Sequence, residues 1–329
     1  MYLRHFGLDN NPFSLTPDPR FLFLTAKHRE ALAALLFAVT ARKGFMVMTG
    51  EAGTGKTTLV RKLLLSIPVT CAQFSVVVNP ALTRSEFLEC VIMDFGQRDV
   101  PTSKALRLAL FQKLLLRAHG EGRTSVLVID EAHLLAGELI EEVRLLSNIE
   151  TSEQKLLQII LVGQSELNRV LDLESLRQLK QRVAIRMHIN PLAQPEVKRY
   201  IQMRWNRACT QHALPFSEDA IALIAHSSEG IPRVINVICD AALVNAYGTG
   251  MKMIGTVQIQ EVLDDLGIAA GSLHATTAVA VSPGSGAHSI DRAPDRSIMT
   301  SGSLDRYLTN KPKDPKFWKI TSWFGMAHN

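Results

Sequence analysis

The sequence predicts an α/β fold with a parallel sheet, followed by an all-helical part. Five short apolar runs, at residues 45–49, 74–78, 126–129, 156–162 and 183–189, alternate with helical patterns, as in β-α-β crossovers. The runs at 126–129 and 156–162 are almost continuously apolar, which is typical of strands covered on both faces. In the run at 183–189 apolar and polar residues alternate, which predicts a half-exposed edge strand.

The helical patterns divide the chain further. A first helix is expected over about residues 27–41, where apolar residues recur at helical spacing. After the last strand, helices are expected to begin near Pro195, after Ser217, at Pro232 and after Thr256. We therefore expect four parts: an irregular N-terminal segment (1–26) packing on the α/β domain, the α/β domain (27–192), a helical domain (193–268) and a low-complexity, disordered tail (269–329).

Composition narrows the class of protein. The 329 residues are 47% hydrophobic and 20% charged, which excludes a wholly disordered or collagen-like chain. Most of the net charge of +5 lies in residues 269–329, so charge alone does not argue for nucleic-acid binding. The four cysteines form no C-x-x-C pair, and no signal peptide or membrane-spanning run is recognisable. We expect reduced thiols and a cytoplasmic location, with peripheral attachment to the inner membrane left open.

A glycine-rich stretch directly follows the first predicted strand. It fits G-x-x-x-x-G-K-T and comprises Gly50, Glu51, Ala52, Gly53, Thr54, Gly55, Lys56, Thr57 and Thr58. Glycines let the backbone wrap around a phosphate, and the N-terminus of the following helix adds partial positive charge. Lys56 can bridge the β- and γ-phosphates, and the Thr57 hydroxyl can bind Mg²⁺. The stretch predicts a site for ATP and Mg²⁺; the alternative is a glycine turn that only joins strand to helix.

Two adjacent carboxylates, Asp130 and Glu131, follow the apolar run at 126–129. Ligands of open α/β sheets bind at the carboxyl ends of the strands, where this pair is expected. Asp130 would hold Mg²⁺ through water, and Glu131 would be the general base for the water that attacks the γ-phosphate. Alone the pair could be a charged turn, but with the glycine-rich loop upstream it predicts a hydrolytic site.

Together with further stretches, these residues resemble an AAA+ ATPase with a P-loop NTPase sheet, and more narrowly the ExeA/GspA-type secretion ATPases. The resemblance covers about residues 1–268. It rests on the opening MYLxxFGLxxxPFSLTPDP, on His28 with Glu30 and Ala31, and on GEAGTGKTTL, VIDEAH, LVGQSEL and GIPRVIN. It implies strand order 5-1-4-3-2, a helical lid, and assembly into a homo-oligomeric ring or filament. The TniB/TnsC/MuB-type transposition ATPases share this machinery.

The resemblance also implies roles for single residues. Gln164 would be sensor 1, with its amide on the γ-phosphate or the attacking water. Arg233, at the start of a lid helix, would be sensor 2. Arg182 would be the arginine finger that reaches the ATP of a neighbouring subunit, with Arg186 as the second choice.

Two interpretations stay open for His133 and for the C-terminal peptide, and His28 has one expected position. His133 follows the two carboxylates and either couples the nucleotide state to the neighbouring helix or only packs there. His28 is expected beside the adenine pocket, with the segment at 12–19. Near the C-terminus, Phe317, Ile320 and Phe324 share a helical face, so this peptide is either a docking element for a partner or lipid surface or an unstructured end.

The sequence thus predicts an ATPase that drives or regulates assembly of a cell-envelope system: type II secretion, a type IV pilus or exopolysaccharide export. GspA-type chains continue into a transmembrane helix and a peptidoglycan-binding domain. We expect neither part here, because no apolar run after residue 268 could span a bilayer. Ser165 stands where Pro is common in that family. The alternative is an ATP-dependent DNA-binding regulator of transposition, with Arg199, Arg204 and Arg207 as candidate DNA contacts. A third reading is a nucleotide-sensing switch that hardly hydrolyses.

Overall fold

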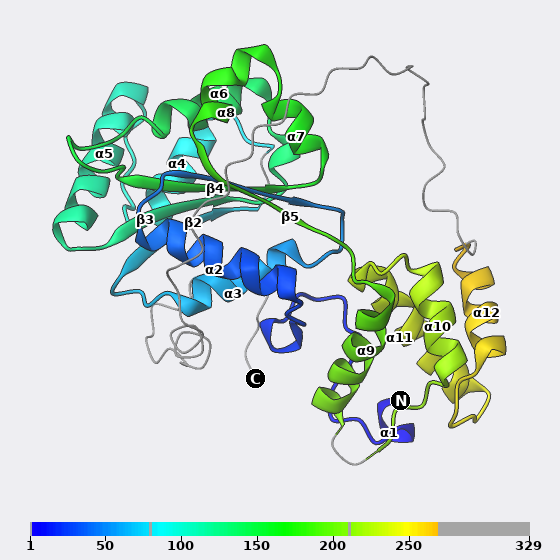
Figure 1. Ribbon diagram of the computed structural model, residues 1–329. Helices are drawn as coiled ribbons and strands as arrows, with labels where there is room; N and C mark the ends of the chain where they lie inside the picture. The colour runs from blue at the N-terminus through cyan, green and yellow to red at the C-terminus, as the bar shows by residue number, and fades with distance from the viewer. Residues whose placement is uncertain (1, 79–80, 210–211, 269–329) are drawn as a thin grey trace, which may run out of the picture.

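The computed structural model describes residues 2–78, 81–209 and 212–268 of the chain. Its centre is a sheet with helices on both faces, and a separate group of helices lies beside one end of the sheet (Figure 1). The predicted disordered tail at 269–329, with the aromatic peptide at 317–324, lies outside the described residues.

The sheet has five parallel strands in the order β2-β3-β4-β1-β5, which confirms the predicted order 5-1-4-3-2. The first strand therefore lies between the last two, and the carboxyl ends of β1, β3 and β4 meet at one edge. The strands are β1 (Phe45–Gly50), β2 (Ala72–Val77), β3 (Thr124–Ile129), β4 (Leu157–Gly163) and β5 (Val183–Ile189).

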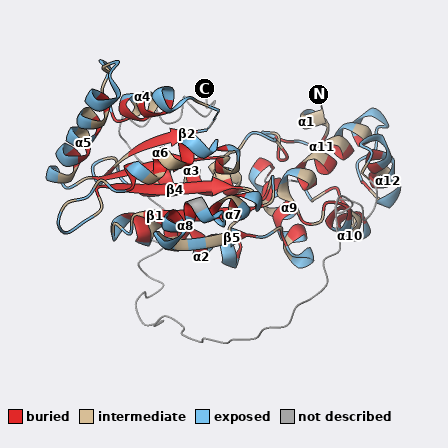
Figure 2. Cartoon of the chain, turned by 90° about the horizontal axis from the view of Figure 1, so that it is seen from above, coloured by how far each residue is buried: buried red, intermediate tan, exposed pale blue. Residues whose placement is uncertain are grey.

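Hydrophobic patterning explains where each strand lies. Strands β1, β3 and β4 are buried along their whole length. The red strands labelled β2 and β4 in Figure 2 show this buried layer. In β5 partly buried and exposed residues alternate up to Ile189, so the edge-strand prediction is confirmed.

Helices cover the two faces of the sheet with separate apolar cores. Residues of α2 and α3 pack on one face and those of α4 to α8 on the other (Figure 1). The elements are α2 (Ala26–Thr40), α3 (Lys56–Ser66), α4 (Arg84–Asp94), α5 (Lys104–Gly120), η2 (Ala132–Leu134), α6 (Gly137–Leu146), α7 (Glu166–Leu171), η3 (Glu174–Leu176) and α8 (Arg177–Gln181).

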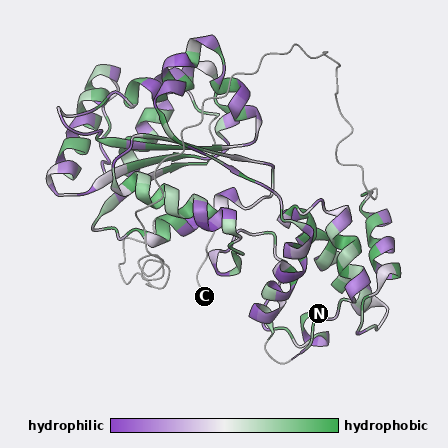
Figure 3. Cartoon of the chain, in the orientation of Figure 1, coloured by the Kyte–Doolittle hydropathy of each residue, from purple (hydrophilic) through white to green (hydrophobic). Residues whose placement is uncertain are grey.

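The second group of helices, here called the lid, has its own core around the fully buried Trp205. Its first helix is largely hydrophilic in Figure 3. Ser217 caps the second helix as predicted, since its side chain accepts from the N–H of Ala220. The N-cap of the fourth helix is Gly255 rather than Thr256, so this helix begins one residue earlier than expected. The lid comprises α9 (Gln194–Ala208), α10 (Glu218–Ser227), α11 (Pro232–Gly248) and α12 (Thr256–Asp265).

The N-terminal segment differs from its prediction. It contains α1 (Tyr2–His5) and η1 (Pro19–Phe21), and it was expected to pack on the α/β domain. Instead Phe6, Leu8 and Phe13 lie in the lid core. Only its later part also reaches the α/β domain, where the guanidinium of Arg61 on α3 donates to the carbonyl of Pro17. The segment therefore joins the lid to the helix that follows the glycine-rich loop.

Within the described part of the chain, no helix has both the length and the apolar character needed to span a membrane.

Candidate nucleotide-binding site

A cavity of about 400 Å³ lies where the α/β domain, the lid and the N-terminal segment meet. Its volume is in the range of small-molecule sites, about 300–1,000 Å³. The α/β domain contributes the loop from Gly53 to Thr58 together with His28 and Glu131. The N-terminal segment contributes residues 14–18 and 21–23, and the lid contributes Tyr200, Arg204, Pro232, Arg233 and Asn236. The predicted phosphate loop therefore lines this cavity.

The glycine-rich loop touches the lid directly. Gly53 has a φ of +82°, a conformation that L side chains rarely adopt, and a Cβ built on it would lie 2.6 Å from Cβ of Arg233. The N–H of Arg233 donates to the carbonyl of Gly53 at 3.3 Å. Only glycine gives the loop both this turn and this close approach to α11, so lid position and loop position are linked.

Lys56 is the first residue of α3 and is 5% exposed. Its ammonium donates to the carbonyls of Gly50 and Glu51, at 2.8 Å each. Burial lowers the pKa of Lys56, and the nearby carboxylates of Glu131 and Asp130 oppose this effect. The side chain is thus folded back on the loop, within reach of any anion that the loop would hold.

The two predicted Mg²⁺ residues are brought together. The Thr57 hydroxyl donates to Oδ2 of Asp130 at 2.7 Å, across the gap between α3 and the end of β3. Asp130 is 4% exposed, and its other oxygen accepts from the N–H of Glu131 at 3.0 Å. A hydroxyl and a carboxylate oxygen suit a hard cation such as Mg²⁺. No cluster of three or more His, Cys, Asp or Glu able to hold a metal exists among the described residues, so phosphate and water oxygens would have to complete the coordination.

Glu131 lines the cavity in a strained backbone conformation. Its φ of +50° and ψ of +36° are left-handed, which for a non-glycine residue costs about 1–3 kcal/mol and persists only where the surroundings enforce it. Its Oε2 is buried and makes no hydrogen bond, although Nδ1 of His133 lies 3.4 Å away. A buried acceptor in this state is available to a water or a proton donor that enters the cavity.

Gln164 follows β4 at the same sheet edge but is not among the residues that line the cavity. Its side-chain amide instead lies 3.2 Å from Nε2 of His133, and its backbone N–H donates to Nδ1 of that ring at 3.4 Å. His133 therefore neighbours the predicted sensor.

His28 borders the cavity beneath the loop, beside the N-terminal segment. Its Nε2 lies 3.3 Å from the carbonyl of Thr54, and its Nδ1 lies 2.8 Å from the hydroxyl of Thr25. These contacts fit a neutral ring with the proton on Nε2, donating to the loop and accepting from Thr25. Burial lowers the pKa of His28 and favours that neutral form.

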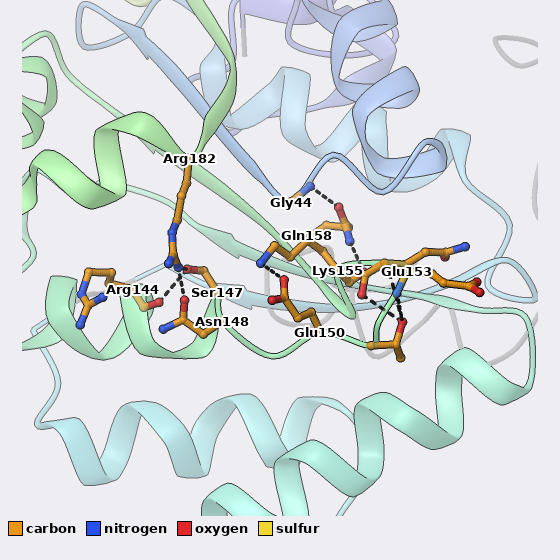
Figure 4. Close-up of polar contacts among 11 residues, drawn as sticks. Gly44, Arg144, Ser147, Asn148, Glu150, Glu153, Lys155, Gln158 and Arg182 are labelled. Carbon is orange, nitrogen blue, oxygen red and sulfur yellow. Dashed lines mark hydrogen bonds and ion pairs between the residues drawn. The ribbon is translucent and has the colours of Figure 1, made fainter.

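Arg182 is not among the residues that line this cavity, and Figure 4 shows its side chain beside Ser147 and Asn148. It directly precedes β5, whose first residue pairs with Phe45 at the start of β1, whereas the loop follows the end of β1. A strand of this length spans roughly 17 Å. Arg182 is exposed, and its guanidinium donates to the Ser147 hydroxyl at 3.2 Å and to the side chain of Asn148. Arg186, also exposed, pairs in register with Val47 midway along the edge strand.

Sequence patterns missed one polar group in the cavity wall. The Tyr200 hydroxyl donates to Asn236 at 2.9 Å and accepts from Arg204 at 2.9 Å, so α9 and α11 are joined there.

Arg204 is 6% exposed and also donates to the carbonyls of Pro12 and Ser14. A buried guanidinium with these partners is not available to DNA, so this candidate contact is wrong, while Arg199 and Arg207 are exposed.

Comparisons with known proteins find relatives of this chain. The model of the AAA domain matches residues 39–171. General secretion pathway protein A of Aeromonas hydrophila is 41% identical over 257 residues, which is 77% of this chain but 46% of that protein, so the chain spans about half of its length. The ATP-dependent target DNA activator B of Escherichia phage Mu is 26% identical over 254 residues, 72% of this chain and 71% of that protein.

Solved structures share the fold at low identity. The Aeropyrum pernix ORC2 protein has a TM-score of 0.61 at 16% identity, over 79% of this chain and 73% of that chain. Cdc6p of Pyrobaculum aerophilum has a TM-score of 0.59 at 18% identity, over 78% of this chain and 71% of that chain. Residues 39–171 thus match an AAA domain, and the chain is related to general secretion pathway protein A.

Proposed function

We propose that the chain binds Mg-ATP in the cavity under the lid and hydrolyses it to ADP and phosphate. The observation that carries the proposal is the hydrogen bond between Thr57 and Asp130, next to Lys56 and the cavity. It joins the phosphate loop to the acidic end of β3, as a shared cation would require.

Different residues would bind the phosphates, hold the magnesium ion and accept the proton in the proposed reaction. Backbone N–H groups of the loop and the ammonium of Lys56 would bind the phosphates, after Lys56 leaves the carbonyls of Gly50 and Glu51. Thr57 and Asp130 would hold the magnesium ion, which neutralises phosphate charge when it is bound. Glu131, which lines the cavity, would accept the proton of the attacking water.

Two arginines would add positive charge from outside the loop. Arg233 lines the cavity and sits on the lid helix that touches Gly53, which supports a role as sensor 2. Arg182 lies near the amino ends of the strands, whereas the loop lies at their carboxyl ends. It would therefore act on the nucleotide of another subunit. Such a role requires a ring or filament, and it requires Arg182 to leave Ser147 and Asn148.

The biological role is proposed from the relative that is 41% identical. The name of General secretion pathway protein A supports a task in secretion. The proposal is a task in a cell-envelope system, namely type II secretion, a type IV pilus or exopolysaccharide export, carried out from the cytoplasmic side.

The test of the activity is phosphate release by the purified chain with Mg-ATP. Lys56→Ala should abolish nucleotide binding, and Glu131→Gln should bind ATP but lower kcat by at least a hundredfold. Lys113→Ala makes the same chemical change on the exposed face of α5 and should match the wild type. Wild-type turnover in Glu131→Gln would refute the base assignment, and binding without turnover in the wild type would favour the nucleotide switch.

A second candidate function is ATP-dependent DNA binding. It is favoured by the similarity to the Mu target DNA activator, which extends over most of both chains. The exposed side of α9 carries Lys198, Arg199 and Arg207, although Lys198 is paired with Glu218 at 2.7 Å. Filter binding over a salt series, with and without ATP, tests this function. Tight, steeply salt-dependent and ATP-dependent binding would favour it over the secretion role.

A further inference from the structure

His133 lies between the proposed base and the proposed sensor. Its Nδ1 is 3.4 Å from Oε2 of Glu131 and 3.4 Å from the backbone nitrogen of Gln164. Its Nε2 is 3.2 Å from the side-chain nitrogen of Gln164. The imidazole therefore contacts two residues that follow different strands, β3 and β4, and it is 10% exposed.

The fold holds the ring in this place. A Cβ built on Gly163, the last residue of β4, would lie 3.2 Å from the backbone nitrogen of His133 and 3.4 Å from its Nδ1. Glycine at this position lets η2 lie against the end of β4. Glu131, directly before η2, adopts its strained left-handed conformation at the start of the same turn. The backbone on both sides of His133 is thus arranged so that the ring reaches Gln164.

Nδ1 of His133 can form a hydrogen bond with only one of its two neighbours at a time, Oε2 of Glu131 or the backbone N–H of Gln164. With the proton on Nδ1, the ring would donate to Oε2 of Glu131 once the carboxylate closes the gap of 3.4 Å, and Nε2 would accept from the side-chain amide of Gln164. With the proton on Nε2, Nδ1 accepts from the backbone N–H of Gln164, and Nε2 donates to the amide oxygen of that residue after the amide turns over. The proton moves between the two nitrogens by exchange with solvent, and the net charge does not change.

The two arrangements differ in what they present to a nucleotide. In the first, His133 holds the carboxylate of Glu131 and the NH₂ of Gln164 points at the ring. In the second, the carboxylate is released and the NH₂ of Gln164 is free to donate to an anion. Gln164 does not line the cavity, so this contact requires its side chain to turn toward a bound nucleotide. A γ-phosphate oxygen that reaches Gln164 would accept a hydrogen bond only in the second arrangement, and it would shift the population toward the state in which the base is free.

We infer that His133 is a positioning residue that couples γ-phosphate sensing by Gln164 to release of the base Glu131; this inference rests on the proposed function. It predicts that His133 acts on the rate of hydrolysis and not on the affinity for ADP, which has no γ-phosphate. It also predicts that the effects of His133 and Gln164 are not additive, because each acts through the other.

The test measures kcat and KM for Mg-ATP, and the affinity for ADP, in the full chain. His133→Phe keeps the ring volume without the nitrogens. Glu131 is then always released, but the amide of Gln164 is no longer oriented by Nε2, so kcat should fall at least tenfold while the affinity for ADP stays within twofold of wild type. The double variant with Gln164→Ala should be no slower than Gln164→Ala alone. His133→Gln, which keeps a donor and an acceptor, should recover part of the loss. Leu134→Ala changes an exposed neighbour in η2 and should match the wild type in kcat.

The outcomes separate the inference from the proposed function. If the wild type hydrolyses ATP through Glu131 but His133→Phe and His133→Gln both keep full kcat, the coupling is refuted. Additive losses in the double variant, or a parallel loss of ADP affinity, would also refute it, because they would indicate a purely structural role. If the wild type shows no hydrolysis, both the coupling and the proposed activity are wrong.

Discussion

The contact between Gly53 and the lid can be tested by adding a single methyl group. Gly53→Ala places a Cβ at 2.6 Å from Cβ of Arg233 and 3.1 Å from Cγ2 of Ile231. The matched control is Gly122→Ala, because Gly122 has a similar φ of +73° but no atom within 4 Å of the added Cβ. Both variants share the backbone strain, and only the first disturbs α11.

The magnitudes follow from these two terms. A left-handed L residue costs roughly 1–2 kcal/mol. The smaller conformational freedom of the unfolded chain offsets about 0.4–1 kcal/mol of this cost. The control should therefore lose about 1 kcal/mol, or about 2–4 °C in Tm for a unit of 150–250 residues. At Gly53 the overlap adds about 1–3 kcal/mol, unless α11 moves away from the loop.

The assay is thermal unfolding combined with hydrogen exchange of the nucleotide-free chain. Gly53→Ala should speed exchange in the first turn of α11, where the N–H of Arg233 donates to the loop, and Gly122→Ala should not. Equal exchange in both variants at equal Tm would refute the reasoning that the lid is held against the loop at this point.

Three further predictions concern other parts of the site. Thr57→Val should remove the Mg²⁺ dependence of ATP affinity, measured by titration with and without EDTA, whereas retained dependence would contradict the cation assignment. Arg204→Met should lower Tm by several degrees and expose the N-terminal segment to protease, because the hydrogen bond from the buried guanidinium to the carbonyl of Pro12 is lost. An unchanged rate of proteolytic cleavage would contradict this prediction. For His28 the folded-state pKa lies below the ordinary 6.5, so the unfolded chain binds the proton first and the free energy of unfolding falls as the pH drops below about 6.5. Tm between pH 7.5 and 5.5 should therefore fall less in His28→Gln than in the wild type, and equal slopes would show that His28 does not contribute.

Much of the fold could be predicted because its signals are local. The continuously apolar runs became the buried strands β3 and β4, and the alternating run became the edge strand β5. The loop at 50–58 and the carboxylates Asp130 and Glu131 could be placed at one sheet edge, because strands in a parallel sheet all end there.

The remainder depends on contacts between distant residues. The hydrogen bonds from Arg204 to Pro12 and from Tyr200 to Asn236 join residues that are 192 and 36 positions apart. In the sequence, Arg204 has the pattern of a surface residue and Tyr200 that of an ordinary core residue. Periodicity could not show that the N-terminal segment packs in the lid core, because its turn-forming residues carry no signal for their partner.

The central claim is that the loop, Lys56 and Asp130 together bind an adenine nucleotide with magnesium. Isothermal titration calorimetry of the purified chain with ATP, with and without Mg²⁺, measures it most directly. The geometry predicts saturable one-to-one binding that weakens at least tenfold without the cation and is lost in Lys56→Ala. No heat of binding for the wild type, or equal binding by Lys56→Ala, would contradict it.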